Sequence, residues 1–286
     1  MNKQIHPDTQ IGKVSLTVTN LDRSVAFYQT LGLTLRQQEN GVAHLGTAAR
    51  DLLELHENPQ AQAVRGTTGL YHFAILLPTR VDLALALTNM AQQQIPLQGY
   101  SDHLVSEAIY LADPDGNGIE VYRDRRREEW PHDVQGKLRM DTIPLNIDSL
   151  MGELNEYKGT WSGFPNGTYN GHIHLHVGNL TKAIQFYTDQ LGFDFVAGYG
   201  SQAGFVSAGG YHHHIGLNTW AGVNAPPPPA DAVGLRWYEI LLPDQEALRR
   251  VEEQLAETAV PFTQTPDGIM LHDPAQNGIL LAMKKN

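Results

Sequence analysis

The sequence predicts an α+β fold built from four copies of one module, in which a strand and a helix are followed by three strands. Two observations predict this fold. Short runs alternate apolar and polar residues, as half-buried strands do, and helical patterns follow them. The motif Asn-Leu, with Phe-Tyr and Leu-Gly downstream, occurs twice, from Asn20 and from Asn179. Such internal repetition indicates repeated architecture.

The first module is predicted over residues 8–60. Val14, Leu16 and Val18 alternate with polar residues, which predicts a strand. Asn20 then stands at an N-cap position, and the helix that it opens should end at Gly32. Three strands are expected next, at about 33–38, 42–46 and 51–57.

The second module is predicted over residues 66–124, with a strand at 69–77, a helix at about 81–93 and an Asp-Pro turn at 113–118 before the last strand. The third and fourth modules, at 169–223 and 232–286, repeat the first and second. The connection at 125–168 is too long for an ordinary loop, and a short helix is expected in it near 147–154.

Composition excludes several classes of protein. The chain has no cysteine, so any metal must be bound by nitrogen and oxygen. A net charge of −11 argues against nucleic acid and anionic membranes as partners. No run is long and apolar enough to span a bilayer, and no signal sequence precedes the first strand, which predicts a cytoplasmic protein. The sequence leaves the formation of a homo-oligomer open.

Histidines are concentrated in two segments. His172, His174 and His176 occupy alternate positions of a predicted strand and should share one face. This pattern alone fits a solvent-facing polar stripe as well as a ligand-binding wall. The run of histidines at 212–214, with His72 and Glu120 in apolar strands, favours the second interpretation because buried ionisable groups need partners.

The repeated modules, the Asn-Leu motif and the turn Asp-Pro-Asp-Gly-Asn-Gly-Ile-Glu at 113–120 resemble the vicinal oxygen chelate superfamily, which includes glyoxalase I, bleomycin-resistance proteins and extradiol dioxygenases. Four modules and a histidine-rich third module are most similar to bacterial catechol 2,3-dioxygenases of the CatE type. The resemblance implies that modules pair edge to edge into half-open barrels. It also implies that metal ligands come from the first and last strand of a module.

The repeats assign these ligand positions in every module. In order they are Lys13 and Glu54, His72 and Glu120, His172 and Gly216, and Trp237 and Leu280. The usual extradiol layout pairs the third module with the fourth, but the fourth offers no ligand here. Pairing the second with the third gives His72, Glu120 and His172 as metal ligands, with modules 1 and 4 as a scaffold without metal. Two histidines and one carboxylate suit Fe(II), with Mn(II) possible.

Further site residues follow from the resemblance. His214 is expected to be the catalytic acid–base histidine, and strand alternation would turn His214 and His212 towards the metal and His213 away. Tyr110 lies where extradiol enzymes have a tyrosine that touches the substrate oxygens, and His103 resembles a histidine that supports it. His174 and His212 are expected to contact the substrate or O₂.

The predicted activity is extradiol cleavage of catechol or a substituted catechol by O₂. Two alternatives remain open at this point. One is a glyoxalase-like isomerase or transferase that binds Mn, Ni or Zn through Glu54, His72 and Glu120. The other is a resistance protein that binds an aromatic compound without turnover. The sequence does not determine the ring substituents of the substrate.

Overall fold

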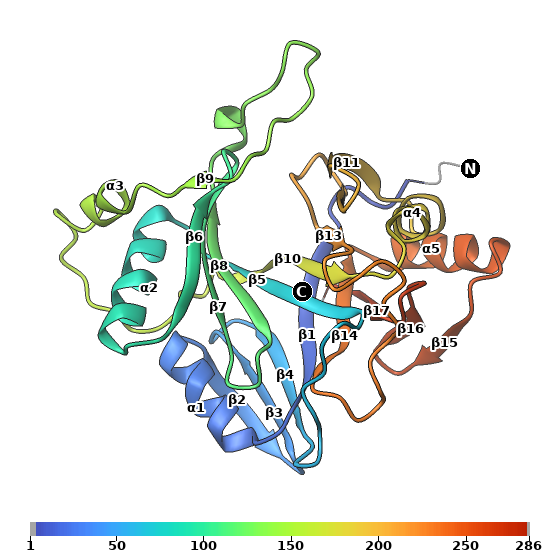
Figure 1. Cartoon of the computed structure of the whole chain (residues 1–286), viewed down its shortest axis with the longest axis horizontal. Coiled ribbons are helices and arrows are strands. Elements are labelled where there is room, and N and C mark those ends of the chain that lie inside the picture. The colour runs from blue at the N-terminus through green and yellow to red at the C-terminus, as the bar shows by residue number, and fades with distance from the viewer. Residues whose placement is uncertain (1–3, 285–286) are drawn as a thin grey trace. The chain divides into compact units, whose positions relative to one another are not determined.

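A computed structural model describes residues 4–284, which form two compact units. Unit 1 comprises the described parts of Met1–Thr17, Gln60–Tyr71 and Gly171–Asn286. Unit 2 comprises Val18–Pro59 and His72–Asn170. Figure 1 follows the elements along the chain from blue to red. Each unit is described separately below.

Unit 2 begins with the helix and the three later strands of module 1. These elements are α1 (Leu21–Leu31), β2 (Thr34–Glu39), β3 (Val42–Gly46) and β4 (Asp51–Glu57), and β3 lies between β2 and β4 in an antiparallel sheet. The side chain of Asn20 accepts a hydrogen bond from the backbone N–H of Arg23, and Gly32 ends the helix at φ 131°. Both predicted helix ends are confirmed, because each residue supplies the conformation or acceptor that a helix end needs.

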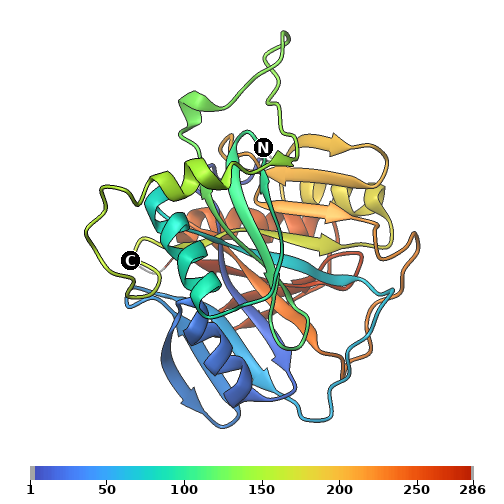
Figure 2. The same ribbon diagram turned by 60° about the vertical axis from the view of Figure 1, so that its left-hand side comes forward.

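Module 2 completes unit 2. Its elements are β5 (Gly69–Leu76), α2 (Arg80–Gln92), β6 (Leu97–Asp102), β7 (Ser106–Ala112) and β8 (Gly118–Asp124). The strand order is β5-β8-β7-β6, with β5 parallel to β8 and the other pairs antiparallel. Helix α2, which starts at a Thr79/Asp82 capping box, lies beside these strands (Figure 1, Figure 2). The order brings the first and last strands of the module together.

The long connection is tied to module 2. It contains η1 (Arg127–Glu129), β9 (Ile143–Pro144) and α3 (Ile147–Gly152), and β9 pairs with β6. Arg80 joins the start of α2 to this connection, because its guanidinium bonds the buried carboxylate of Glu107 and also the carbonyl oxygen of Ser149 in α3. The predicted short helix is therefore present and fixed in place.

Glu107 is a buried acid of unit 2 that is paired with three arginines. Its side chain is 3% exposed and contacts the guanidinium groups of Arg80, Arg123 and Arg125 at 2.6–3.5 Å. Burial acts to raise the pKa of Glu107, but the hydrogen bond from Arg80 and the charge of Arg123 outweigh burial, so its pKa is lowered.

Unit 1 holds modules 3 and 4 and the first strand of module 1. The elements of modules 1 and 3 are β1 (Gln10–Val18, up to Thr17 in this unit), β10 (Tyr169–His176, from Gly171), α4 (Leu180–Gln185), η2 (Phe186–Gln190), β11 (Asp194–Tyr199), β12 (Ala203–Ser207) and β13 (Ile215–Asn218). Those of module 4 are β14 (Gly234–Leu242), α5 (Gln245–Glu257), β15 (Phe262–Thr265), β16 (Gly268–His272) and β17 (Gly278–Met283).

Both modules of unit 1 repeat the strand order of module 2. Module 3 has the order β11-β12-β13-β10, and module 4 has β15-β16-β17-β14, with β1 antiparallel to β14. In each, the first and last strands are parallel neighbours. The structure confirms the predicted α+β class. Most of its elements are strands, which form curled half-barrel sheets, and helices are few.

A buried tyrosine and an aspartate recur at equivalent places. The Tyr28 hydroxyl donates to Asp113 in unit 2, and the Tyr187 hydroxyl donates to Asp273 in unit 1. Each carboxylate also accepts hydrogen bonds from the backbone of its own Asp-Pro turn. Burial, and then the nearby carboxylate, raises the pKa of both tyrosines well above its usual value. Both hydroxyls therefore remain protonated donors.

Among the described residues, no helix combines the length and apolarity required to cross a membrane.

Candidate metal centre

Strand register supports the predicted equivalence of the ligand positions. In module 2, Glu120 pairs with the residue two places after His72. In module 3, Gly216 pairs with the residue two places after His172, and in module 4, Leu280 pairs with the residue two places after Trp237. Because alternate residues of a strand share one face, the two positions of each module project from the same side of its sheet.

The first candidate ligands are His72 and Glu120 in unit 2. The His72 Nε2 lies 3.1 Å from a carboxylate oxygen of Glu120. Both residues are buried, at 6% and 2% exposed. Two atoms bound side by side to one ion at about 2.1 Å each lie about 3 Å apart, so this spacing suits two ligands of one metal. The neighbours of Glu120 along β8, Ile119 and Val121, are fully buried.

Tyr110 and His103 extend this pair within unit 2. Tyr110 is the register partner of Glu120, and its ring centre lies 5.7 Å from that of His72. The Tyr110 hydroxyl lies 2.7 Å from Nε2 of His103. Nδ1 of His103 lies 2.9 Å from the carbonyl oxygen of Asp141, in the connection.

These contacts determine which atoms carry protons. A carbonyl oxygen can only accept, so Nδ1 of His103 carries the proton and Nε2 of the neutral ring accepts. The Tyr110 hydroxyl therefore donates to Nε2, and a hydroxyl oxygen that donates in this way can also accept a hydrogen bond. The connection thus orients a predicted substrate contact through His103.

In unit 1, His172 is 1% exposed and lies among other imidazoles. Its ring centre is 4.1 Å from that of His213 and 6.2 Å from that of His212. The expectation that alternation turns His213 away is wrong, because β13 begins only at Ile215 and the histidine run lies outside it. The consecutive glycines at 209 and 210, both at positive φ, are the sequence signal that could have indicated this break.

His214 has a defined tautomer in unit 1. Its Nδ1 accepts a hydrogen bond from the backbone N–H of Ala208 at 3.1 Å and lies 3.0 Å from the Ser207 hydroxyl. Since Nδ1 is an acceptor, Nε2 carries the proton of the neutral ring. The residue is 7% exposed, and its ring lies 4.9 Å from that of Tyr211.

His174 lies over the glycine that replaces a ligand in module 3. A Cβ atom at Gly216 would come within 2.8 Å of the His174 ring, so only glycine leaves room for this arrangement. The ring also contacts Phe205 and Trp220, with centres 5.8 and 5.4 Å away. His174 is therefore held inside an aromatic group, consistent with a wall for an aromatic ligand.

The ligand positions of modules 1 and 4 have other contacts. The Lys13 ammonium lies 5.2 Å from the centre of the Trp237 ring in unit 1, a cation–π contact. In unit 2, a carboxylate oxygen of Glu54 lies 2.6 Å from Nε2 of His56. Among the described residues, no group of metal-ligating atoms joins Glu54 to His72 and Glu120. The glyoxalase-like ligand set therefore has no support in the structure.

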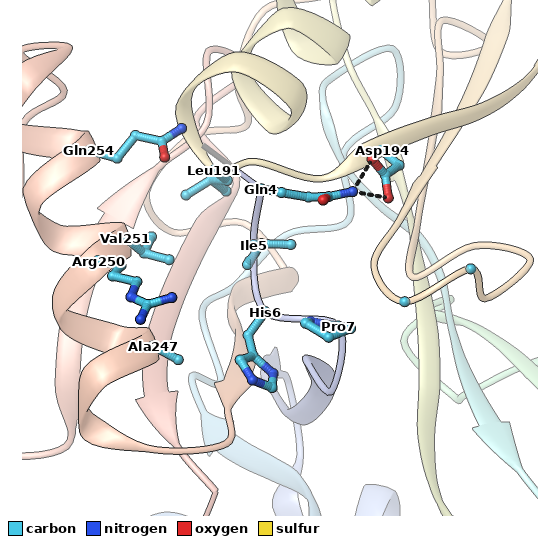
Figure 3. Close-up of a pocket in the computed structure, with 12 residues that line it drawn as sticks. Gln4, Ile5, His6, Pro7, Leu191, Asp194, Ala247, Arg250, Val251 and Gln254 are labelled. Carbon is cyan, nitrogen blue, oxygen red and sulfur yellow. Dashed lines mark hydrogen bonds between the residues drawn. The ribbon is translucent and has the colours of Figure 1, made fainter. Parts of the chain in front are cut away.

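A separate pocket of about 250 Å³ lies in unit 1, beside helix α5 (Figure 3). The N-terminal residues Gln4 to Pro7 line it, together with Asp194 and Arg250. Gln4 donates two hydrogen bonds to the Asp194 carboxylate. No residue of the predicted site lines this pocket.

A family comparison identifies the repeated modules. The sequence profile of the glyoxalase/bleomycin resistance protein/dioxygenase superfamily matches residues 10–121 and 170–279. The chain belongs to this superfamily. The two matched segments leave out residues 122–169, which include the predicted connection.

Comparison with individual proteins of known name or structure supports the same assignment. The chain is 46% identical over 281 residues to the catechol-2,3-dioxygenase of Bacillus subtilis strain 168, covering 96% of this chain and 98% of the relative. The resemblance to catechol 2,3-dioxygenases is confirmed. An inferred dioxygenase of known structure from Bacillus subtilis strain 168 matches with a TM-score of 0.64 at 14% identity, over 99% of this chain and 87% of that chain. Glyoxalase I from Zea mays matches with a TM-score of 0.58 at 15% identity, over 96% and 92%. These two structures share the fold.

Proposed function

We propose that this chain is an Fe(II)-dependent extradiol dioxygenase, which cleaves catechol or a substituted catechol next to the diol and inserts O₂. The observation that carries the proposal is the buried His72–Glu120 contact at 3.1 Å, in a chain that is 46% identical to a catechol-2,3-dioxygenase. A buried carboxylate facing an imidazole is costly unless a proton or a cation compensates it. Mn(II) is the alternative ion.

The third proposed ligand is His172. It occupies the position in module 3 that His72 occupies in module 2, and it is almost completely buried. Together these residues supply two imidazoles and one carboxylate, a donor set that can hold a metal ion. This choice pairs module 2 with module 3 around one ion. When bound, Fe(II) would accept both oxygens of the diol and O₂ at its remaining positions.

Tyr110 and His103 are proposed to position the diol. The Tyr110 hydroxyl donates to His103, so its oxygen accepts a hydrogen bond from a substrate hydroxyl. The neutral His103 ring cannot become the donor to Tyr110 while its Nδ1–H donates to the carbonyl oxygen of Asp141. The proposed role of this pair is to present a fixed acceptor to one oxygen of the substrate.

His214 is proposed as the acid–base residue. Its Nδ1 is occupied by the N–H of Ala208, so Nε2 is the atom that donates and receives the proton. Histidine suits this role because its ordinary pKa lies near neutral pH. His174 and His212 are proposed to contact the substrate or O₂, with His174 in the aromatic group around Trp220.

The experiment is anaerobic loading with Fe(II), followed by oxygen uptake and absorbance measurements with catechol. One O₂ per catechol and a yellow ring-fission product are expected. Glu120→Gln, His72→Ala and His172→Ala should lose iron and at least about 100-fold in activity, because loss of a proposed ligand should cost more than the roughly 10- to 100-fold of losing a partner of a ligand. His132→Ala, in the connection, is the matched control. Full iron occupancy in His172→Ala would exclude the proposed triad, and catechol binding without oxygen uptake would indicate a binding protein.

A further inference from the structure

A cluster of aromatic rings lies in unit 1 beside the proposed ligand His172. His174 follows two residues later on β10, so both side chains project from one face, about 7 Å apart along the strand. The ring of Tyr71 lies 5.2 Å from that of His174 and 5.1 Å from that of His176, the next position on this face. The Trp220 ring lies 5.1 Å from Tyr71 and 5.4 Å from His174. These four rings, at 71, 174, 176 and 220, are called the aromatic cluster below.

The aromatic cluster extends from the protein interior to solvent. His174 is 5% exposed, whereas Tyr71 and Trp220 are 41% and 44% exposed. Single exposed aromatic residues are common, but large apolar rings that touch one another at the surface form a patch, and such patches mark binding sites. The two exposed rings can therefore receive a further apolar group without any opening of the core.

One amide group fixes the orientation of the cluster. The side-chain oxygen of Asn218 accepts a hydrogen bond from the backbone N–H of Trp220 at 3.0 Å and lies 2.7 Å from Nδ1 of His176. Because this oxygen can only accept, Nδ1 of His176 carries the proton and donates to it. The end of β13 and an imidazole of β10 are thus held by the same side chain.

The loop that follows the cluster is also attached to the body of unit 1. The backbone N–H of Asn224 donates to the carbonyl oxygen of Gly178 at 2.7 Å, and that of Thr68 donates to the carbonyl oxygen of Pro226 at 2.9 Å. The Thr68 hydroxyl donates to the carbonyl oxygen of Ala275 at 2.7 Å. The two segments that carry the exposed rings are therefore joined to each other. A preformed surface of this kind binds a ligand with little cost in ordering.

We propose that Tyr71 and Trp220 give this chain a preference for catechols that carry an uncharged apolar substituent, alkyl or aryl. The inference rests on the proposed function, because it takes the diol to be bound beside His172, so that the ring extends along His174 and its substituent meets the two exposed rings. An alkyl or aryl group gains ring contacts there and loses apolar surface to water. A carboxylate substituent would lose hydration instead.

The test compares catechol with 3-ethylcatechol, 4-ethylcatechol and 3,4-dihydroxybenzoate. Binding to the full chain loaded with Fe(II) is measured without oxygen by isothermal titration calorimetry, and kcat/KM for ring fission is measured separately. Each buried carbon of the substituent is worth about fourfold in Kd, so the wild type should bind one ethylcatechol up to about 15-fold more tightly than catechol. It should bind 3,4-dihydroxybenzoate less tightly than that ethylcatechol.

Variants assign this preference to the two rings. Tyr71→Ala and Trp220→Ala should each reduce the ratio of the two Kd values at least about fourfold, because each ring is expected to cover one carbon of the substituent. Trp220→Phe, which keeps a ring, should retain most of it. Tyr157→Ala is the matched control, since Tyr157 is also 41% exposed but lies in the connection of unit 2.

The wild-type measurement alone can overturn the proposal. Binding of both ethylcatechols no tighter than that of catechol would do so, and so would equally tight binding of 3,4-dihydroxybenzoate. A preference that survives in both alanine variants, or that falls equally in Tyr157→Ala, would also refute the role of the two rings. Absence of ring fission with the binding preference intact would refute the proposed function and leave this inference standing.

Discussion

Replacing Tyr110 by phenylalanine tests the hydrogen-bond chain that connects the long connection to the candidate metal centre. The change keeps the ring that packs against His72 and removes one oxygen. That oxygen donates to His103 and is proposed to accept from the substrate. Its loss leaves Nε2 of His103 without its 2.7 Å donor and the substrate hydroxyl without an acceptor. An unsatisfied polar group of this kind costs about 1–3 kcal/mol, which predicts a fall in kcat/KM of about 5- to 150-fold.

The assay is the initial rate of ring fission over a range of catechol concentrations, with protein loaded with Fe(II) without oxygen. Iron content is measured on the same samples, since the argument requires equal occupancy. Tyr100→Phe is the matched control, because Tyr100 lies on the neighbouring strand β6 and is 45% exposed. A Tyr110→Phe variant with normal iron content and kcat/KM within twofold of the wild type would refute the proposed role.

Three further predictions concern stability and the shape of the site. In denaturant titrations, Tyr187→Phe should lower the free energy of unfolding by about 1–3 kcal/mol more than Tyr28→Phe does. Both hydroxyls bond an aspartate, but among the described contacts only the Tyr187 hydroxyl also bonds a second buried hydroxyl, that of Tyr238. The lowered pKa of Glu107 means that its stabilising effect is complete above its unfolded value near 4.5 and is lost as the pH falls through its lower folded pKa. Glu107→Gln should therefore be less stable than the wild type at pH 7, with the difference shrinking on acidification in pH-dependent melts. Gly216→Ala should displace the His174 ring, because the added Cβ would lie 2.8 Å from it. The variant should have a raised KM for catechol and an unchanged iron content. An unchanged KM would contradict the proposed role of His174.

The sequence predicted local features well because local residues determine them. Asn20 and Gly32 define the ends of α1 through their own acceptor and backbone conformation, and the structure confirms both. The sequence placed His72 and Glu120 at equivalent positions of neighbouring strands because the repeats indicate which strands correspond. The parallel register of β5 and β8 in the structure agrees with this placement. Periodicity and repetition were sufficient for these features.

Long-range contacts of irregular segments could not be predicted in the same way. The carbonyl of Asp141 reaches His103 only because β9 pairs with β6, and a two-residue strand has no periodicity to detect. The position of His213 was predicted wrongly because alternation holds only where a strand is paired, and β13 starts after the histidine run. In both cases tertiary contacts, which one sequence does not display, determine where the side chain lies.

The modules separate the residues that maintain the fold from those that can hold a metal. The Asp-Pro turns at Asp113 and Asp273 each accept a hydrogen bond from a buried tyrosine. This contact is the same in both modules, although two of the proposed ligands belong to module 2 and none to module 4. The ligand positions lie on strands whose backbone bonding does not depend on the side chain, so Trp237 can replace a histidine without breaking the sheet. Glu120, in contrast, is a buried acid that an apolar core would not favour. The proposed ion would compensate this buried charge, and this reasoning predicts that the chain without metal gains stability when Glu120 is replaced by glutamine.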